Sequence, residues 1–109
     1  MKIDDYMEKA MTTALPSALN MQYMGFNLVA EVGEVLGIEA KVLRDHEGNF
    51  QSVPDMEALQ KKELGDAFWQ LVGICFVKGY LPSELLQANL DKLADRQKRG
   101  VIGGSGDTR

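Results

Sequence analysis

The sequence has little of what disulfide scaffolds and soft-metal sites require: one cysteine, Cys75, and one histidine, His46. A lone cysteine can form neither an internal disulfide nor a thiolate metal cluster. Because Cys75 lies within the apolar run 71–77, we expect a buried, unreactive thiol. A lone histidine excludes a di-iron bundle built from Glu-x-x-His motifs and argues against tetrahedral zinc.

Long apolar runs and an excess of positive charge are also missing. No stretch approaches the ~20 apolar residues of a membrane span, and residues 1–5 lack the hydrophobic segment of a signal peptide. We therefore expect a cytoplasmic protein. The net charge of -4 argues against nucleic acid or an anionic membrane as the main partner, since both select basic surfaces. A small anionic ligand is compatible with this net charge if cationic side chains or a metal ion are concentrated at its binding site.

Apolar residues recur at helical spacing, and no stretch alternates as a half-buried strand does. With glycine and proline as breaks, the pattern predicts helices from Ile3 to about residue 14, from residue 17 or 18 to about Arg44, over 56–78 and over 83–99. Asp55 is the expected N-cap of the third helix. The fold class is therefore all-α, a four-helix bundle forming one domain over residues 1–99. Residues 100–109 form a glycine-rich tail that we expect to be mobile or to order on a ligand.

The second and third predicted helices are apolar on more than one face, as Phe68, Trp69, Leu71 and Val72 show. Such a helix needs cover on both sides, which one small bundle can hardly supply. We expect a homo-oligomer, most simply a dimer or a dimer of dimers.

Two acidic pairs, Glu31/Glu34 and Glu63/Asp66, lie in apolar helices with spacing that places each pair on one helix face. Like charges so placed repel, and a lysine or arginine one turn away usually offsets the repulsion. Only Asp66 has such a candidate, Lys62. Because buried charges are paired or bind metal, four carboxylates brought together by helix packing predict a site for Mg²⁺, with Mn²⁺ as the alternative.

A glycine stands at the same place inside each pair, Gly33 in the first and Gly65 in the second. Glycine costs about 1 kcal/mol in a helix interior relative to alanine. We therefore expect the two backbones to approach closely at these positions.

The pattern Glu31-x-x-Glu34, a loop, then Glu63-x-x-Asp66 resembles the metal-binding motif of the MazG-like nucleoside triphosphate pyrophosphohydrolases. The resemblance runs roughly from Met24 to the C-terminus and includes segments 28–35, 62–69, 89–96 and 99–109. Ala30 is one departure, because many members carry a second acid there. The four expected ligands are unaffected.

The resemblance implies a magnesium-dependent hydrolase that converts a nucleoside triphosphate, or its deoxy form, to the monophosphate and pyrophosphate. Glu31, Glu34, Glu63 and Asp66 would hold the metal, and one of them, left open here, would accept a proton from the attacking water.

Asn89, Lys92 and Arg96 share one face of the last helix, and the resemblance favours phosphate binding by these three residues. For Arg99, a favourable interaction with the helix dipole is explanation enough.

Two alternatives remain open: a phosphoribosyl-ATP pyrophosphohydrolase-like activity and a non-catalytic helical dimerisation module. The preferred base and sugar and the number of metal ions also stay open.

Overall fold

A computed structural model describes residues 1–109, and the chain is all-helical, with four α-helices and no strand. The helices are α1 (Ile3–Met11), α2 (Met21–His46), α3 (Pro54–Lys78) and α4 (Pro82–Arg99). Short 3-10 turns at Pro16–Ala18 and Phe50–Ser52 lie in the first two connections. The four predicted helices are thus confirmed, with ends shifted by a few residues.

Local chemistry explains where the long helices begin. The Asn20 side chain accepts a hydrogen bond from the N–H of Tyr23 at 2.8 Å and caps α2. The prediction that Asp55 caps α3 is wrong, because the helix already starts at Pro54, whose fixed φ suits a first helical position. Asp55 lies instead in the first turn, where its charge favours the positive end of the helix dipole.

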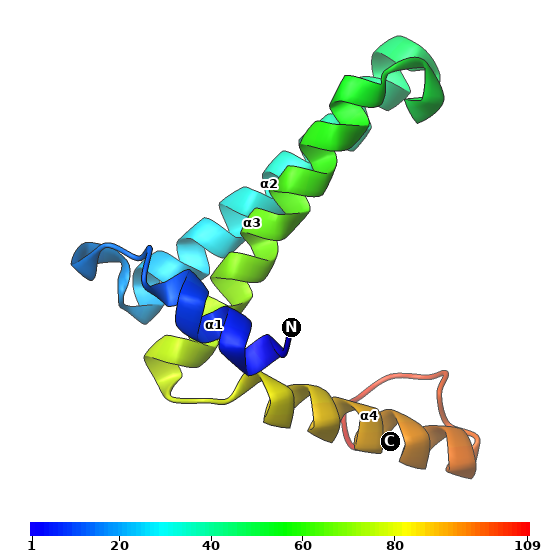
Figure 1. The fold of residues 1–109 in the computed structure, drawn as a ribbon. Helices are drawn as coiled ribbons and strands as arrows, with labels where there is room; N and C mark the ends of the chain where they lie inside the picture. The colour runs from blue at the N-terminus through cyan, green and yellow to red at the C-terminus, as the bar shows by residue number, and fades with distance from the viewer.

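The α2–α3 hairpin is the largest unit, and α1 crosses it near the open end (Figure 1). The core lies at this crossing and consists of Met7, Ala10, Met11, Met24, Val72 and Cys75. Cys75 is buried, as predicted.

Helix α4 packs against α1 and projects away from the α2–α3 hairpin, so a single chain does not close a four-helix bundle (Figure 1). Asp4 of α1 fixes the start of α4, because its carboxylate accepts a hydrogen bond from the N–H of Ser83 at 2.9 Å. The radius of gyration is 17.2 Å, whereas a compact domain of this length has about 13 Å. The molecule is therefore bent and open.

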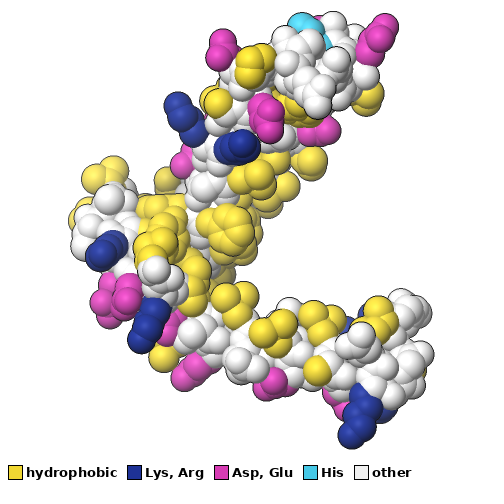
Figure 2. Space-filling model, turned by 45° about the vertical axis from the view of Figure 1, so that its right-hand side comes forward, with side chains coloured by type: hydrophobic (Ala, Val, Ile, Leu, Met, Phe, Trp, Pro, Cys, Tyr) yellow, Lys and Arg dark blue, Asp and Glu magenta, His cyan; other side chains and the backbone are white.

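Much apolar surface remains uncovered. Ten hydrophobic residues are buried, whereas 22 large ones are exposed. Figure 2 shows hydrophobic side chains gathered along the inner side of the bend, over the hairpin and the α4 arm. No helix is long and apolar enough to cross a membrane.

Candidate metal and nucleotide site

The antiparallel packing of α2 on α3 brings the two acidic pairs together. Carboxylate oxygens of Glu31, Glu63 and Asp66 lie within 4.8 Å of one another. Glu34 is exposed and lies outside this group of three, close enough to Glu31 and Glu63 to raise the pKa of both. We call these four residues the acidic cluster. Three of the four predicted ligands thus have carboxylate oxygens close to one another, and the fourth, Glu34, lies beside this group.

The charge of the acidic cluster is not balanced by the protein. None of its carboxylates takes part in an ion pair, and Lys62, the expected partner of Asp66, forms none. Asn27 donates to Oε1 of Glu31 at 3.4 Å, but Oε2 of Glu31 is buried without any hydrogen-bond partner. Because an unpartnered buried carboxylate oxygen is costly, this donor set fits a hard divalent cation.

Hydrogen bonding, lost solvation and neighbouring negative charge raise the pKa of two members of the acidic cluster. The pKa of Glu63 is raised to about 7, chiefly by its hydrogen bond with Glu34, then by lost solvation and by the charges of Glu34, Asp66 and Glu31. Partial burial, followed by the charges of Glu34 and Asp66, raises the pKa of Glu31. The metal-free cluster therefore retains protons at a pH where isolated carboxyl groups have lost them.

The prediction of close backbone approach at the two glycines is wrong. A Cβ atom built at Gly33 or Gly65 meets no atom within 4 Å. The acidic side chains approach each other across the helix pair, and the intervening glycines face open space. The close approach in this hairpin is at Gly73, where a Cβ would lie 2.5 Å from Sδ of Met24.

A pocket of about 430 Å³ opens beside the acidic cluster. This volume is in the range that holds small organic ligands. Trp69 is fixed in its wall because Nε1 donates to the carbonyl of Ala10 at 3.2 Å and to Oγ1 of Thr13 at 3.1 Å. The lining residues are Thr13, Tyr23, Asn27, Glu31, Asp66, Trp69 and Gln70.

The predicted phosphate-binding residues lie on the α4 arm. Lys92 and Arg96 converge on Asp107 of the tail, with Nζ of Lys92 and Nη2 of Arg96 at 2.7 and 3.1 Å from the same carboxylate oxygen. Asn89 is exposed and forms no side-chain hydrogen bond within the chain. Arg99 pairs with Asp95 one turn away. Within one chain, the basic residues and the acidic cluster belong to arms that diverge (Figure 1).

Three residues of these sites were not singled out from the sequence: Asn27, Gln70 and Asp107. Asn27 could have been found, because it lies one turn before Glu31 on the same helix face. Gln70 is buried, and its Oε1 has no partner, but no sequence pattern marks a glutamine inside an apolar helix. Asp107 follows three glycines and a serine in segment 103–106, and this composition gave no reason to expect a fixed position.

The sequence of the chain is similar to that of a phage protein. No protein-family model matches the sequence, and no solved structure matches the fold. The Gene 37 protein of Mycobacterium phage L5 is 35% identical, over the full length of both chains. Since this identity spans both proteins completely, the chain belongs to the same family as the Gene 37 protein of Mycobacterium phage L5.

Proposed function

We propose that this protein is a magnesium-dependent nucleotide pyrophosphohydrolase of the MazG-like kind, which cleaves a nucleoside or deoxynucleoside triphosphate to the monophosphate and pyrophosphate. One observation carries the proposal. Three carboxylates from two helices lie within 4.8 Å of one another, and one of them keeps a buried oxygen without a partner. The resemblance of the two acidic motifs to MazG-like proteins supports the same function.

Glu31, Glu63 and Asp66 are the residues that would hold Mg²⁺, with Mn²⁺ as an alternative. Such an ion would neutralise phosphate oxygens and lower the pKa of a water molecule that attacks the α-phosphorus. Asn27 orients Glu31 by donating to its Oε1.

Glu34 is the proposed proton acceptor. It is exposed and lies outside the group of three carboxylates, yet its carboxyl group contacts Glu63. A carboxylate that is not needed as a ligand can take the proton of the attacking water while remaining within the acidic cluster.

The pocket beside the acidic cluster suits the nucleoside part of such a substrate. Tyr23 and Trp69 offer aromatic faces, and Thr13, Asn27 and Gln70 offer polar groups. With the phosphates at the acidic cluster, the base and sugar would enter this pocket. A nucleotide is the class of small molecule that combines phosphate groups for the metal with a base and a sugar for the pocket.

A homodimer completes the proposal. The accessible surface is 7834 Å², whereas a compact monomer of 12.1 kDa exposes about 6,000 Å². The excess of roughly 1,800 Å² is more than one partner buries in a standard interface, about 800 Å². A second copy packed into the bend would cover exposed residues of α3 and α4, among them Phe68, Leu71, Leu86 and Leu90.

The test is pyrophosphate release from a panel of nucleoside and deoxynucleoside triphosphates and phosphoribosyl-ATP, with Mg²⁺ and with chelator. We expect release from at least one triphosphate in Mg²⁺ and none in chelator. Glu34→Gln should abolish turnover while the fold is kept. Glu8→Gln, the same change at an exposed acid of α1, is the matched control and should leave turnover unchanged.

The other outcomes separate the alternatives. Release of pyrophosphate from phosphoribosyl-ATP alone would indicate a phosphoribosyl-ATP pyrophosphohydrolase-like activity instead. No release from any substrate would favour a non-catalytic dimerisation module. Full activity in Glu34→Gln would remove Glu34 from the mechanism.

A further inference from the structure

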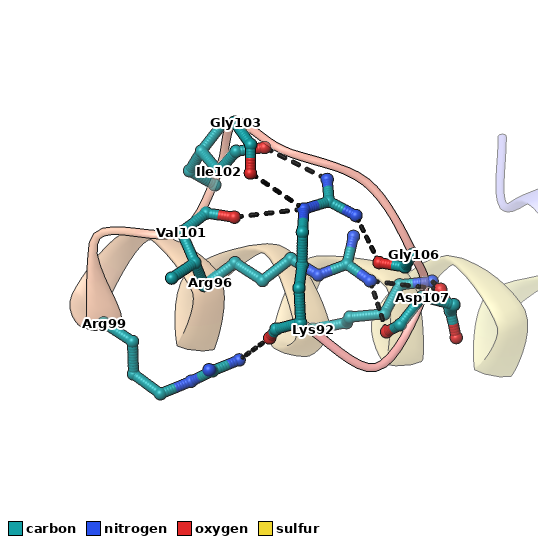
Figure 3. A network of polar contacts seen from close by, with 9 residues as sticks. Lys92, Arg96, Arg99, Val101, Ile102, Gly103, Gly106 and Asp107 are labelled. Carbon is teal, nitrogen blue, oxygen red and sulfur yellow. Dashed lines mark hydrogen bonds and ion pairs between the residues drawn. The ribbon is translucent and has the colours of Figure 1, made fainter.

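The glycine-rich tail forms a loop that turns back along α4 (Figure 3), and the side chain of its last residue, Arg109, bonds to carbonyl oxygens of this loop. The guanidinium of Arg109 donates to the carbonyl oxygens of Val101 at 3.1 Å, Ile102 at 3.0 Å, Gly103 at 3.0 Å and Gly106. Arg99 donates in turn to the main-chain oxygen of Arg109. A segment expected to be mobile, or to order on a ligand, thus follows a defined path along α4.

This arrangement uses the carbonyl groups of the tail and leaves its N–H groups free. The backbone N–H of Val101 bonds to Arg96, and no N–H from 102 to 109 donates to another backbone group. Gly104 and Gly106 both have φ of 89°, a conformation that favours glycine. Free N–H groups in glycine-rich turns are common ligands of anions.

The centre of the loop is a contact between one carboxylate and two cations. Oδ1 of Asp107 accepts from Lys92 at 2.7 Å and from Arg96 at 3.1 Å, and the main-chain oxygen of Asp107 accepts from Arg96 at 2.6 Å. Only 8% of the Arg96 side chain is exposed, whereas 77% of the Asp107 side chain is. The hydrogen bond from Lys92 is the main reason why the pKa of Asp107 is lowered. A fixed pair of cations therefore faces a single, solvent-exposed anionic group.

The resemblance to MazG-like proteins already implies phosphate binding by Lys92 and Arg96. We propose that the tail completes this site, and that the Asp107 carboxylate occupies it until a phosphate or pyrophosphate anion displaces it. Arg109 keeps the loop folded, so Lys92, Arg96 and the free N–H groups of the tail receive the incoming oxygens together. The nature of the anion rests on the proposed function, since pyrophosphate is its leaving group.

Exchange is favoured by the chemistry of the two anions. A carboxylate carries one charge on two oxygens, whereas pyrophosphate offers more charge and more oxygens to the same donors. The exposed Asp107 side chain can swing into water at little cost, because exposed ion pairs are weak. Arg96 keeps its second contact, the main-chain oxygen of Asp107, and this contact holds the loop near α4 during the exchange.

The test measures binding of inorganic pyrophosphate by calorimetry in the presence of chelator, so that no metal site contributes. We expect Asp107→Asn to bind about fivefold more tightly than the unmodified protein, because the competing charge is gone. Asp95→Asn removes an acid of the same helix arm that pairs with Arg99, and should change affinity little. Arg96→Gln should abolish binding. Equal or weaker binding by Asp107→Asn, or no binding by any form, would overturn the proposal.

Hydrogen exchange at Gly103, Gly104 and Gly106 gives a second measurement. Pyrophosphate should slow exchange of these N–H groups in the unmodified protein, and unchanged exchange would contradict their role. Neither measurement requires turnover. If no nucleotide is hydrolysed but Asp107→Asn still binds pyrophosphate more tightly, the proposed function fails and the anion site stands.

Discussion

Competition between protons and Mg²⁺ at the acidic cluster gives the most informative prediction. With the pKa of Glu63 raised to about 7, about one tenth of this carboxyl group is ionised at pH 6 and about nine tenths at pH 8. Because a metal ligand must be deprotonated, the affinity for Mg²⁺ should rise about tenfold from pH 6 to pH 8 through Glu63 alone.

Calorimetric titration of the metal-free protein with Mg²⁺ at the two pH values measures this change. Glu63→Gln should bind Mg²⁺ weakly and lose most of the pH dependence. Glu8→Gln, which removes the same charge from an exposed position, should behave as the unmodified protein does. An affinity that is equal at pH 6 and pH 8 would refute the reasoning, and so would a pH dependence that survives in Glu63→Gln.

Three further predictions concern stability. The metal-free protein should lose thermal stability as pH rises from about 4.5 to 7. The reason is that the raised pKa of Glu63 makes the folded state bind more protons than the unfolded state in this pH range. A melting temperature that rises over this range would contradict the prediction. Gly73→Ala should lower the melting temperature by up to roughly 16 °C, because overpacking costs about 1–3 kcal/mol and helix propensity offsets about 1 kcal/mol of this. The new Cβ would lie 2.5 Å from Sδ of the fully buried Met24. Gly65→Ala, with no atom within 4 Å of the new Cβ, should raise stability by about 1 kcal/mol, and a loss measured by calorimetry would show that something unseen in one chain packs there.

The positions of the helices could be predicted from the sequence because each rests on local chemistry. Proline and glycine at 16, 79 and 82 interrupt the helical spacing of apolar residues. Helix α3 ends just before Gly79 and α4 begins at Pro82, whereas Pro16 lies in the connection between α1 and α2. The directions of the helices could not be predicted. A helix that is apolar on more than one face does not specify which face meets which neighbour, and α4 accordingly packs on α1 and leaves much of its apolar face exposed.

The acidic cluster was predictable because carboxylates in apolar helices without cations need an explanation. Spacing alone placed Glu31 beside Glu34 and Glu63 beside Asp66, and the packing of α2 on α3 joined the pairs. That the cluster holds a metal stays a prediction.

The folded tail was beyond sequence reasoning. Its order depends on one arginine, Arg109, whose guanidinium donates hydrogen bonds to carbonyl oxygens of the backbone. Because every residue has a carbonyl group, no pattern of side chains predicts such a contact.

The central claim is that the acidic cluster of α2 and α3 holds a divalent cation. Crystals grown with Mn²⁺ and measured at its absorption edge locate that ion directly by anomalous scattering. We expect a peak coordinated by carboxylate oxygens of Glu31, Glu63 and Asp66, with the buried Oε2 of Glu31 engaged. A crystal in which these side chains carry no anomalous peak, while Mn²⁺ binds elsewhere or not at all, would contradict the claim.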